Sequence, residues 1–423
     1  MFIIYDLIFL ILGILYLCSY AIRGKLHKGL WMRFGVFPKD IRNSLESGKN
    51  NIWIHAVSVG ETVSLKKLIE SLREEFKDYR LIISTVTRTG NDIAKSLVKN
   101  DELVIFLPFD LSFITRRTVQ IIRPKIFILA ETEIWPNLIT NLSRKHIPIV
   151  LINGRISDKS LRGYRIIGLF VKTLFHKISY FCMQTDSDAK RVISLGAPQD
   201  KVKTCGNMKF DNSDYGDKKI DYSDNLNLGR EEKLWVCGST HPGEEEVILE
   251  AYKRLLKDFT DLRLLIAPRH VERTQNIEGL VKKYGFTPLR ISNLNPLTIN
   301  YKPSTIFILD TMGELRQFYA LATMVFVGGS LIRKGGHNII EPASLGKPVI
   351  FGPHMFNFAD IAGTFLNKGA AVMVRDKDQL YSSLKGLLDN PDKARLLGEG
   401  AKSVCLENQG ATGRVLEVIG KQI

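Results

Sequence analysis

The sequence predicts an α/β protein with two domains, each built on a parallel sheet that has helices on both faces. The chain has 423 residues, which is too long for one ordinary domain. Short apolar segments alternate with helical stretches in two regions, and a polar segment, 211–232, separates these regions. The apolar fraction of 45% and the charged fraction of 24% are typical of a folded globular protein.

Each expected strand is short, apolar and followed by a polar or glycine-containing turn, as in strands buried within a parallel sheet. In the first region the expected strands are NIWIHAV, RLIISTV, LVIFLPF, KIFILAE, PIVLING and YFCMQ. In the second region they are KLWVCGS, LRLLIAP, TIFILD, MVFVGGS and KPVIFGP. The segment between them is rich in Asp, Lys, Asn, Ser and Gly, which indicates an interdomain linker. Residues 396–423 end the chain as an expected helical stretch.

The chain begins with an apolar segment, residues 1–22, that has one charged side chain, Asp6. It is about long enough to cross a bilayer. The basic residues that follow are Arg23, Lys25, Lys28 and Arg33. By the positive-inside rule we expect the rest of the chain on the cytoplasmic side. A helix that lies on the membrane surface, or a buried first helix, is the alternative, and Asp6 favours it.

The composition predicts anionic partners, because the net charge is +15 and the isoelectric point is about 9.4. Nucleic acid is not expected, since the basic residues are dispersed and no zinc-finger, RNP-type or helix-turn-helix pattern occurs. An anionic membrane surface is the expected partner. The five cysteines have neither metal-ligand nor disulfide spacing, which indicates a reducing compartment.

The turn after the first expected strand has a carboxylate at the start of the next helix. A turn that binds phosphate at a helix N-terminus has no acidic residue there. Ser58, Val59 and Gly60 form this turn, and a helix begins at Glu61. An anion at this position repels phosphate and suits a proton acceptor. The helix dipole favours the ionised form, so we expect Glu61 to be a carboxylate at neutral pH. A first-turn acid that merely complements the dipole is the alternative.

A second acidic turn follows the strand KIFILAE. Glu131 and Glu133 can accept hydrogen bonds from hydroxyl groups, and the face of Trp135 can pack on a sugar ring. The alternative is a solvated loop with a buried tryptophan.

Two turns in the second region have groups suited to an anion. Ser239 and Thr240 follow a strand and either bind an anion at the backbone or cap the next helix. Arg269 also follows a strand, where it can bind phosphate in a bidentate manner. An exposed, ion-paired loop is the alternative for Arg269.

The longest motif runs from a strand through a glycine-rich loop to a helix. Gly335 and Gly336 allow the backbone to come close to a ligand. Glu341 can accept hydrogen bonds from a ribose diol, or it is a first-turn acid. His337 and His270 have no further His or Cys at metal-ligand spacing, so no metal site is expected.

Taken in order, these motifs resemble those of the Kdo (3-deoxy-D-manno-octulosonic acid) transferases of lipopolysaccharide synthesis, glycosyltransferase family 30. The resemblance covers nearly the whole chain. Its segments are HAVSVGE, ETEIWPN, GNMKFD, GSTHPGEE, APRHVER, TMGEL and GGSLIRKGGHNIIEPA followed by KPVIFGP.

The resemblance implies a GT-B fold, in which two Rossmann-like domains face each other across a cleft, with an N-terminal membrane helix. It implies inversion at the anomeric centre, no metal and no cofactor, because CMP-Kdo is a substrate. The implied segments are a membrane anchor (1–22), an acceptor domain (23–210), a linker (211–232), a CMP-Kdo domain (233–395) and a C-terminal helix that packs back toward the N-terminal domain (396–423).

The resemblance also assigns residues. Glu61 would be the general base that deprotonates the primary hydroxyl of the lipid A precursor (lipid IVA), at the inner (cytoplasmic) membrane. The acceptor side would include Ser58, Gly60, Glu131 and Glu133. The donor side would include Arg269 on the CMP phosphate, with Met312, Gly313, Gly336, Asn338 and Glu341 around the nucleotide.

Two other functions stay open at this point. One is a different GT-B enzyme, either another lipid glycosyltransferase or a sugar-nucleotide epimerase. The other is a non-catalytic, membrane-bound protein that binds a nucleotide or lipid, in which Glu61 and Arg269 have structural roles only.

Overall fold

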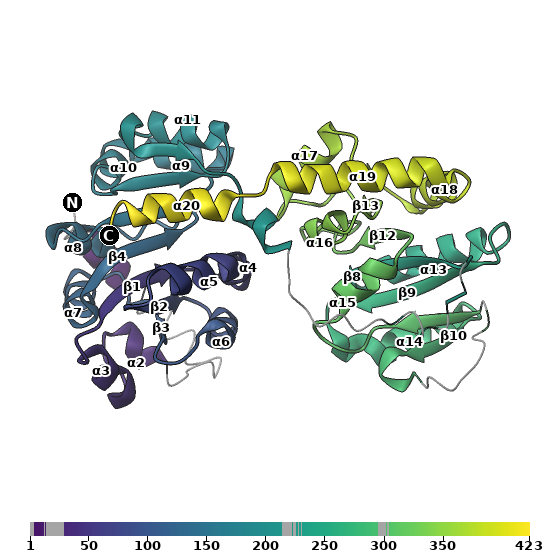
Figure 1. Cartoon of the computed structure of the whole chain (residues 1–423), viewed down its shortest axis with the longest axis horizontal. Helices are drawn as coiled ribbons and strands as arrows, with labels where there is room; N and C mark the ends of the chain where they lie inside the picture. Colours follow the sequence, from purple (N-terminus) through teal and green to yellow (C-terminus); the bar gives the residue numbers. More distant parts are fainter. Residues whose placement is uncertain are drawn as a thin grey trace. The chain divides into compact units, whose positions relative to one another are not determined.

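The computed structural model describes residues 4–11, 13, 29–213, 222, 226, 228–229, 231–294, 302 and 304–423. The chain divides into two compact units (Figure 1). The first unit comprises Met1–Asn212 together with Gln409–Ile423, and the second comprises Ser213–Asn408. Each unit has a seven-stranded parallel sheet, which confirms the predicted α/β class.

The sheet of the first unit has the strand order β3-β2-β1-β4-β5-β6-β7. Its strands are β1 (Asn50–His55), β2 (Tyr79–Thr85), β3 (Leu103–Phe106), β4 (Pro124–Ala130), β5 (Ile149–Gly154), β6 (Tyr180–Met183) and β7 (Val202–Thr204). Its helices are α2 (Leu30–Arg33), α3 (Lys39–Leu45), α4 (Val59–Ser64), α5 (Lys66–Glu75), α6 (Arg88–Leu97), α7 (Ser112–Ile122), α8 (Pro136–Arg144), α9 (Asp158–Ile166), α10 (Gly168–Phe175), α11 (Asp186–Ser194) and α20 (Ala411–Gly420), with 3₁₀ turns η1 (Gln199–Lys201) and η2 (Met208–Ser213).

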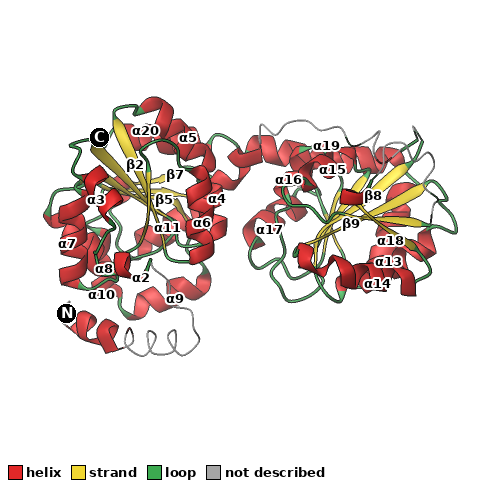
Figure 2. Ribbon diagram, turned by 90° about the horizontal axis from the view of Figure 1, so that it is seen from below, coloured by secondary structure: helices red, strands yellow, loops and turns green. Residues whose placement is uncertain are grey.

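Helices cover both faces of this sheet (Figure 2) because its strands are apolar on both sides. Successive side chains of β1 enter two different apolar clusters. Trp53 packs with Phe127 in one cluster, whereas Ile52 and Ile54 belong to the other. The continuous apolar runs of the sequence are therefore explained by a sheet buried on both faces.

The sheet of the second unit has the order β10-β11-β9-β8-β12-β13-β14. Its strands are β8 (Lys233–Thr240), β9 (Leu262–Pro268), β10 (Thr287–Arg290), β11 (Thr305–Ile308), β12 (Met324–Val327), β13 (Val349–Phe351) and β14 (Val372–Met373). Its helices are α13 (Glu244–Leu255), α14 (Thr274–Lys283), α15 (Leu315–Leu321), α16 (Ile340–Ser344), α17 (Ala359–Asn367), α18 (Lys377–Leu388) and α19 (Pro391–Glu407), with 3₁₀ turns η3 (Val271–Arg273) and η4 (Ile291–Asn293).

The C-terminal segment differs from the single helical stretch expected over 396–423. It contains the end of α19, which belongs to the second unit, and α20, which belongs to the first. The two helices separate at Gly410, whose φ of 87° is left-handed. Asp211 fastens the start of α20 by accepting hydrogen bonds from the backbone N–H groups of Gly410 (2.7 Å) and Thr412 (2.5 Å).

The expected membrane helix, 1–22, lies mostly outside the described residues, as does most of the expected linker, 211–232. Within the part of the chain that is described, no helix is long and apolar enough to cross a membrane. Residues 4–11 are helical. Tyr5 donates a hydrogen bond to Asp110 (2.9 Å), and Asp6 accepts hydrogen bonds from Ser112 N (3.1 Å) and Asn137 Nδ2 (2.7 Å).

Candidate active site

Glu61 lies just beyond the carboxyl end of β1, in the first turn of α4. Ser58 caps this helix, since its Oγ accepts a hydrogen bond from Glu61 N (3.3 Å) and donates one to Glu61 Oε1 (2.8 Å). Val57 N donates to the other carboxylate oxygen, Oε2 (2.7 Å). Glu61 is therefore a first-turn acid that reaches back to the turn, and only 9% of its surface is exposed.

The ionisation of Glu61 differs from the sequence-based expectation. Burial, followed by the negative charge of Glu131, raises the pKa of Glu61 to about 7; the hydrogen bonds from Val57 and Ser58 lower it, and Glu133 adds to the rise. We expected Glu61 to be ionised at neutral pH, whereas a pKa of about 7 leaves it only partly ionised, because burial and the neighbouring acids oppose the helix dipole. A pKa near the working pH suits a general base.

The acidic turn after β4 brings two carboxylates toward Glu61. Glu131 has a left-handed φ of 56°, and its N–H donates to Ile152 O on β5 (2.8 Å). Burial, followed by the charge of Glu131, raises the pKa of Glu133. Lys209 Nζ lies 3.9 Å from Glu131 Oε1, so a cation adjoins these acids. Lys209 lies in the segment GNMKFD, which carries part of the family resemblance, but the sequence assigned it no individual role.

His55 and Trp135 lie beside each other at the same edge, with their ring centroids 6.3 Å apart. His55 is fully buried, and its Nδ1 is 3.0 Å from both O and Oγ of Ser84. Burial lowers the pKa of His55 to about 4, so this ring is neutral. His55 Nε2 and Trp135 Nε1 have no hydrogen-bond partner among the described residues. This edge of the first sheet therefore has buried polar atoms without a hydrogen-bond partner among the described residues, as well as an aromatic ring.

Glu244 joins two loops at the carboxyl edge of the second sheet. Its fully buried carboxylate accepts hydrogen bonds from the backbone N–H groups of His241 (3.1 Å), Gly329 (2.7 Å), Ser330 (3.0 Å) and Leu331 (3.0 Å). The loop after β8 is thus fixed to the loop after β12. The sequence did not reveal this role, since an acid at the start of α13 is ordinary.

The loop after β8 does not cap α13 through a hydroxyl group. Gly243 is the residue at the N-cap of this helix, with a φ of 96°, so the predicted capping alternative for Ser239 and Thr240 is wrong. Ser239 itself has a left-handed φ of 56°. Such a backbone conformation in a residue other than glycine is typical of a functional turn.

Arg269 is exposed beyond the end of β9, and its backbone N–H donates to Thr240 O (3.0 Å). Its guanidinium makes no hydrogen bond or ion pair with another residue in the described ranges. The nearby Arg273, by contrast, pairs with the buried Glu245 (3.0 Å). The alternative of an ion-paired loop therefore describes Arg273, whereas Arg269 is available to a ligand.

The glycines of the loop after β12 are required by the packing of the protein itself. Gly335 and Gly336 have φ values of 97° and 71°. A Cβ atom on Gly336 would lie 2.2 Å from Met355 Sδ, and one on Gly335 would lie 2.3 Å from Asn357 Nδ2. These glycines let the backbone of the loop lie close to Met355 and Asn357 of the second unit. They are therefore not by themselves a sign of a bound ligand.

The other predicted donor residues lie on two loops of the second unit. Asn338 Nδ2 donates a hydrogen bond to Glu341 Oε1 (3.0 Å) at the start of α16. Met312 is 84% exposed, and Gly313 has a φ of 89°, in the turn between β11 and α15.

Comparison with known proteins identifies the family. The family model described as 3-deoxy-D-manno-octulosonic-acid transferase (kdotransferase) matches residues 28–212. A 3-deoxy-D-manno-octulosonic acid transferase of Haemophilus influenzae is 34% identical over 371 residues, which cover 87% of this chain and 86% of the relative. The chain belongs to the Kdo transferase family. Another family member, from Chlamydophila psittaci, is 31% identical and covers 90% of this chain and 86% of its own length.

Family membership decides between the functions that the sequence left open. A Kdo transferase is an enzyme that transfers a sugar. The chain is therefore neither a non-catalytic binding protein nor a sugar-nucleotide epimerase. A UDP-GlcNAc 2-epimerase from Neisseria meningitidis is similar in fold, with a TM-score of 0.61 over 88% of this chain and 100% of that chain. The two sequences are only 13% identical, so this similarity concerns the GT-B-like fold alone.

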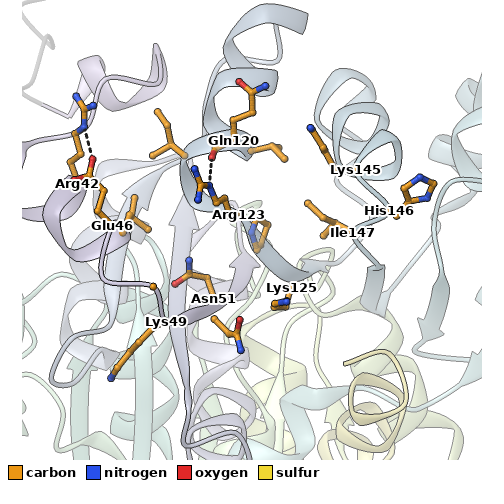
Figure 3. Close-up of a pocket in the computed structure, with 16 residues that line it drawn as sticks. Arg42, Glu46, Lys49, Asn51, Gln120, Arg123, Lys125, Lys145, His146 and Ile147 are labelled. Carbon is orange, nitrogen blue, oxygen red and sulfur yellow. Dashed lines mark hydrogen bonds and ion pairs between the residues drawn. The ribbon is translucent and has the colours of Figure 1, made fainter.

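An open cavity of about 1140 Å³ lies away from these residues, at the amino edge of the first sheet (Figure 3). Its basic lining residues are Arg42, Lys49, Arg123, Lys125, Lys145 and His146. Arg123 follows the end of α7, and Lys145 and His146 follow the end of α8. Basic residues at helix C-termini complement the helix dipole, which accounts for these three of the lining residues.

Proposed function

We propose that this Kdo transferase moves Kdo from CMP-Kdo to the primary hydroxyl of the lipid A precursor (lipid IVA), with inversion at the anomeric centre and Glu61 as general base. The observation that carries the proposal is the environment of Glu61. A nearly buried carboxylate with a pKa of about 7 lies at the edge of the sheet where α/β proteins bind ligands. It can take up a proton at neutral pH.

The chemical step needs one proton acceptor on the acceptor side. Each oxygen of the Glu61 carboxylate already accepts one hydrogen bond, from Ser58 Oγ and Val57 N, and each keeps a further lone pair for a substrate hydroxyl. The hydroxyl proton passes to Glu61 while the hydroxyl oxygen bonds to the anomeric carbon of Kdo. The bond between this carbon and the phosphate oxygen breaks, and CMP leaves with the electron pair.

The donor side is proposed to lie in the second unit. The unpaired guanidinium of Arg269 binds the CMP phosphate, and the paired side chains of Asn338 and Glu341 face the ribose, with Gly336 in the same loop. Met312 and Gly313 flank the nucleotide. One arginine suits one phosphate group, so no metal is included in the proposal.

Membrane attachment is proposed through an apolar patch of the first unit, formed by Ile4, Leu7, Ile8, Ile11, Ile166, Ile167 and Leu169. These side chains are between 51% and 85% exposed. The two parts of the patch adjoin, because the ring centroids of Tyr5 and Phe170 are 6.5 Å apart. The polar side of the first helix bonds to the protein through Tyr5 and Asp6, which favours a helix that lies on the membrane surface.

This position suits the inner membrane and its cytoplasmic face. The net charge of +15 attracts anionic head groups, and the acceptor is itself a lipid.

A product analysis tests the proposed reaction. Purified protein is incubated with CMP-Kdo and the lipid A precursor, and the lipid is examined by mass spectrometry. We expect the lipid mass to increase by one or more Kdo units, with release of CMP. A lipid that stays unmodified while CMP-Kdo binds would contradict the proposed acceptor.

A further inference from the structure

Two histidine rings lie edge to edge, in nearly the same plane, at the carboxyl edge of the second sheet. His241 follows β8 and His337 lies in the loop after β12, with ring centroids 5.2 Å apart and planes that differ by 6°. Their Nε2 atoms are 2.9 Å apart, which is hydrogen-bond distance. One Nε2 must carry the proton and the other must accept it.

This geometry limits the charge that the pair can hold. When both rings are neutral, the donating ring has a bare Nδ1. One added proton fits at that Nδ1 and leaves the hydrogen bond between the rings intact. A second added proton would place N–H groups on both facing nitrogens and break the hydrogen bond. The pair can therefore change between a charge of zero and a charge of +1.

The surroundings of the pair keep it neutral when no anion is bound. Burial, followed by the charge of Arg269, lowers the pKa of His337 to about 4. Burial also lowers the pKa of His241, and His270, Lys334 and Arg273 add to this effect. The ring of His270 lies 6.0 Å from that of His241.

The acids near the pair are already engaged. Glu244 accepts four backbone N–H groups, including that of His241, and Glu245 pairs with Arg273. Metal ligation does not explain the pair, since no three His, Cys, Asp or Glu side chains within the described ranges could hold a metal ion.

The donor proposed above carries two anionic groups, the phosphate diester of CMP and the carboxylate of the sugar acid. Arg269 supplies one positive charge. We propose that the His241–His337 pair supplies a second positive charge by taking up one proton when CMP-Kdo binds. The pair then recognises the donor's other anionic group, the carboxylate of the sugar acid. This inference rests on the proposed placement of the donor in the second unit.

The alternative is that the histidine pair only holds the two loops together. A Cβ atom on Gly329 would lie 2.9 Å from His337 Cδ2, so the pair is tightly enclosed. Packing alone would give donor affinity no dependence on the ionisation of these rings, whereas proton uptake makes affinity depend on pH. An anion beside the pair raises its pKa, so binding is tightest at low pH and weakens as pH rises, by up to about tenfold per pH unit.

Proton uptake is measured by calorimetric titration of the full chain with CMP-Kdo, without acceptor, in two buffers of different ionisation enthalpy at one pH. Both anionic groups of CMP-Kdo are ionised around neutral pH, so the protons counted belong to the protein. We expect uptake of up to about one proton per donor bound, because the pair accommodates only one.

Substitutions assign the uptake to the pair. H337Q and H241Q each keep a neutral hydrogen-bonding group, and we expect both to abolish the uptake and to flatten the pH dependence of the donor KM. H146Q, in the first unit, is the matched control and keeps the wild-type uptake. Thermal melting checks that the variants fold.

Several results would overturn the inference. The inference is contradicted if the wild type takes up no proton on binding CMP-Kdo. It is also contradicted if proton uptake is unchanged in both H337Q and H241Q, or if uptake is lost only in H270Q. Failure to bind CMP-Kdo at all would instead contradict the proposed function.

Discussion

Glu61 owes its expected reactivity to its neighbours. Its capping geometry is local, because Ser58 and Glu61 are three residues apart on one helix turn. Its pKa of about 7, by contrast, depends on burial and on Glu131, which lies 70 positions away in sequence. The position of this carboxylate was therefore predictable from the sequence, but its ionisation was not.

Removing the charge of Glu131 should shift the pH dependence of the reaction. In E131Q one repulsive charge is lost and Lys209 stays nearby, so the pKa of Glu61 falls. Because the base must be ionised, activity in the wild type should rise with pH through about 7. We expect the midpoint of kcat/KM in E131Q to lie at lower pH.

The control for this shift is E70Q, which removes an exposed acid of α5 and should keep the wild-type midpoint. An E131Q midpoint at or above the wild-type value would show that Glu131 does not act on the base.

At the scale of elements, three of the six left-handed residues other than glycine in the described ranges lie where strands end, whereas Asn100, Arg123 and His146 follow helices. Glu131 after β4, Asn153 at the end of β5 and Ser239 at the end of β8 have φ values of 56°, 51° and 56°. Left-handed conformations cost free energy in residues other than glycine, and they cluster at functional turns. The sequence gives no sign of this conformation at Glu131 or Ser239, whereas Asn153, which precedes Gly154, is of a residue type that tolerates it.

The close contact between β8 and β12 predicts the effect of a single methyl group. A Cβ atom on Gly328 would lie 2.5 Å from Ser239 O and 2.7 Å from Thr240 Cα, both backbone atoms. G328A should therefore destabilise the protein by about 1–3 kcal/mol or more in chemical denaturation, as overpacked sites do.

The matched control is G279A, in the interior of α14, where a Cβ atom would meet nothing within 4 Å. We expect G279A to stabilise the protein by about 0.5–1 kcal/mol, because alanine is the better helix former. Equal stabilities of G328A and the wild type would contradict the packing of these two strands.

The strands that the sequence did not reveal are β7, β10 and β14. All three are edge strands of two to four residues, and their side chains are only partly buried. Apolar runs identify strands that are buried on both faces, so the central strands were predictable and these edges were not. The sequence also did not predict contacts between distant segments, such as those of Glu244 with the loop after β12 and of His241 with His337.

At the scale of the whole molecule, the apolar patch and the positive charge predict how the protein binds membranes. Replacing Ile166 and Leu169 by serine removes two exposed apolar side chains from the patch. We expect this variant to sediment with anionic vesicles at least about tenfold less than the wild type. Vesicles of neutral lipid should bind less protein, and salt should weaken binding to the anionic ones.

The control is L396S, which removes a leucine of α19 that is 60% exposed and belongs to the second unit. It should bind vesicles like the wild type. If the patch variant does so too, the patch is not the membrane-binding surface.

The motifs, in the order in which they occur along the chain, were enough to indicate the family by resemblance. The sequence could not tell which polar atoms already have partners within the protein. Arg269 and Arg273 lie four residues apart, yet only Arg273 has an acidic partner, Glu245.

The central claim, that Glu61 is the base of Kdo transfer, is tested most directly by the turnover of E61Q. Kdo transfer to the lipid A precursor is followed by mass spectrometry at saturating CMP-Kdo, with E70Q as the matched control. We expect E61Q to lose a factor of roughly a hundred or more in kcat while E70Q keeps the wild-type rate. A correctly folded E61Q protein that transfers Kdo at a rate near that of the wild type would contradict the claim.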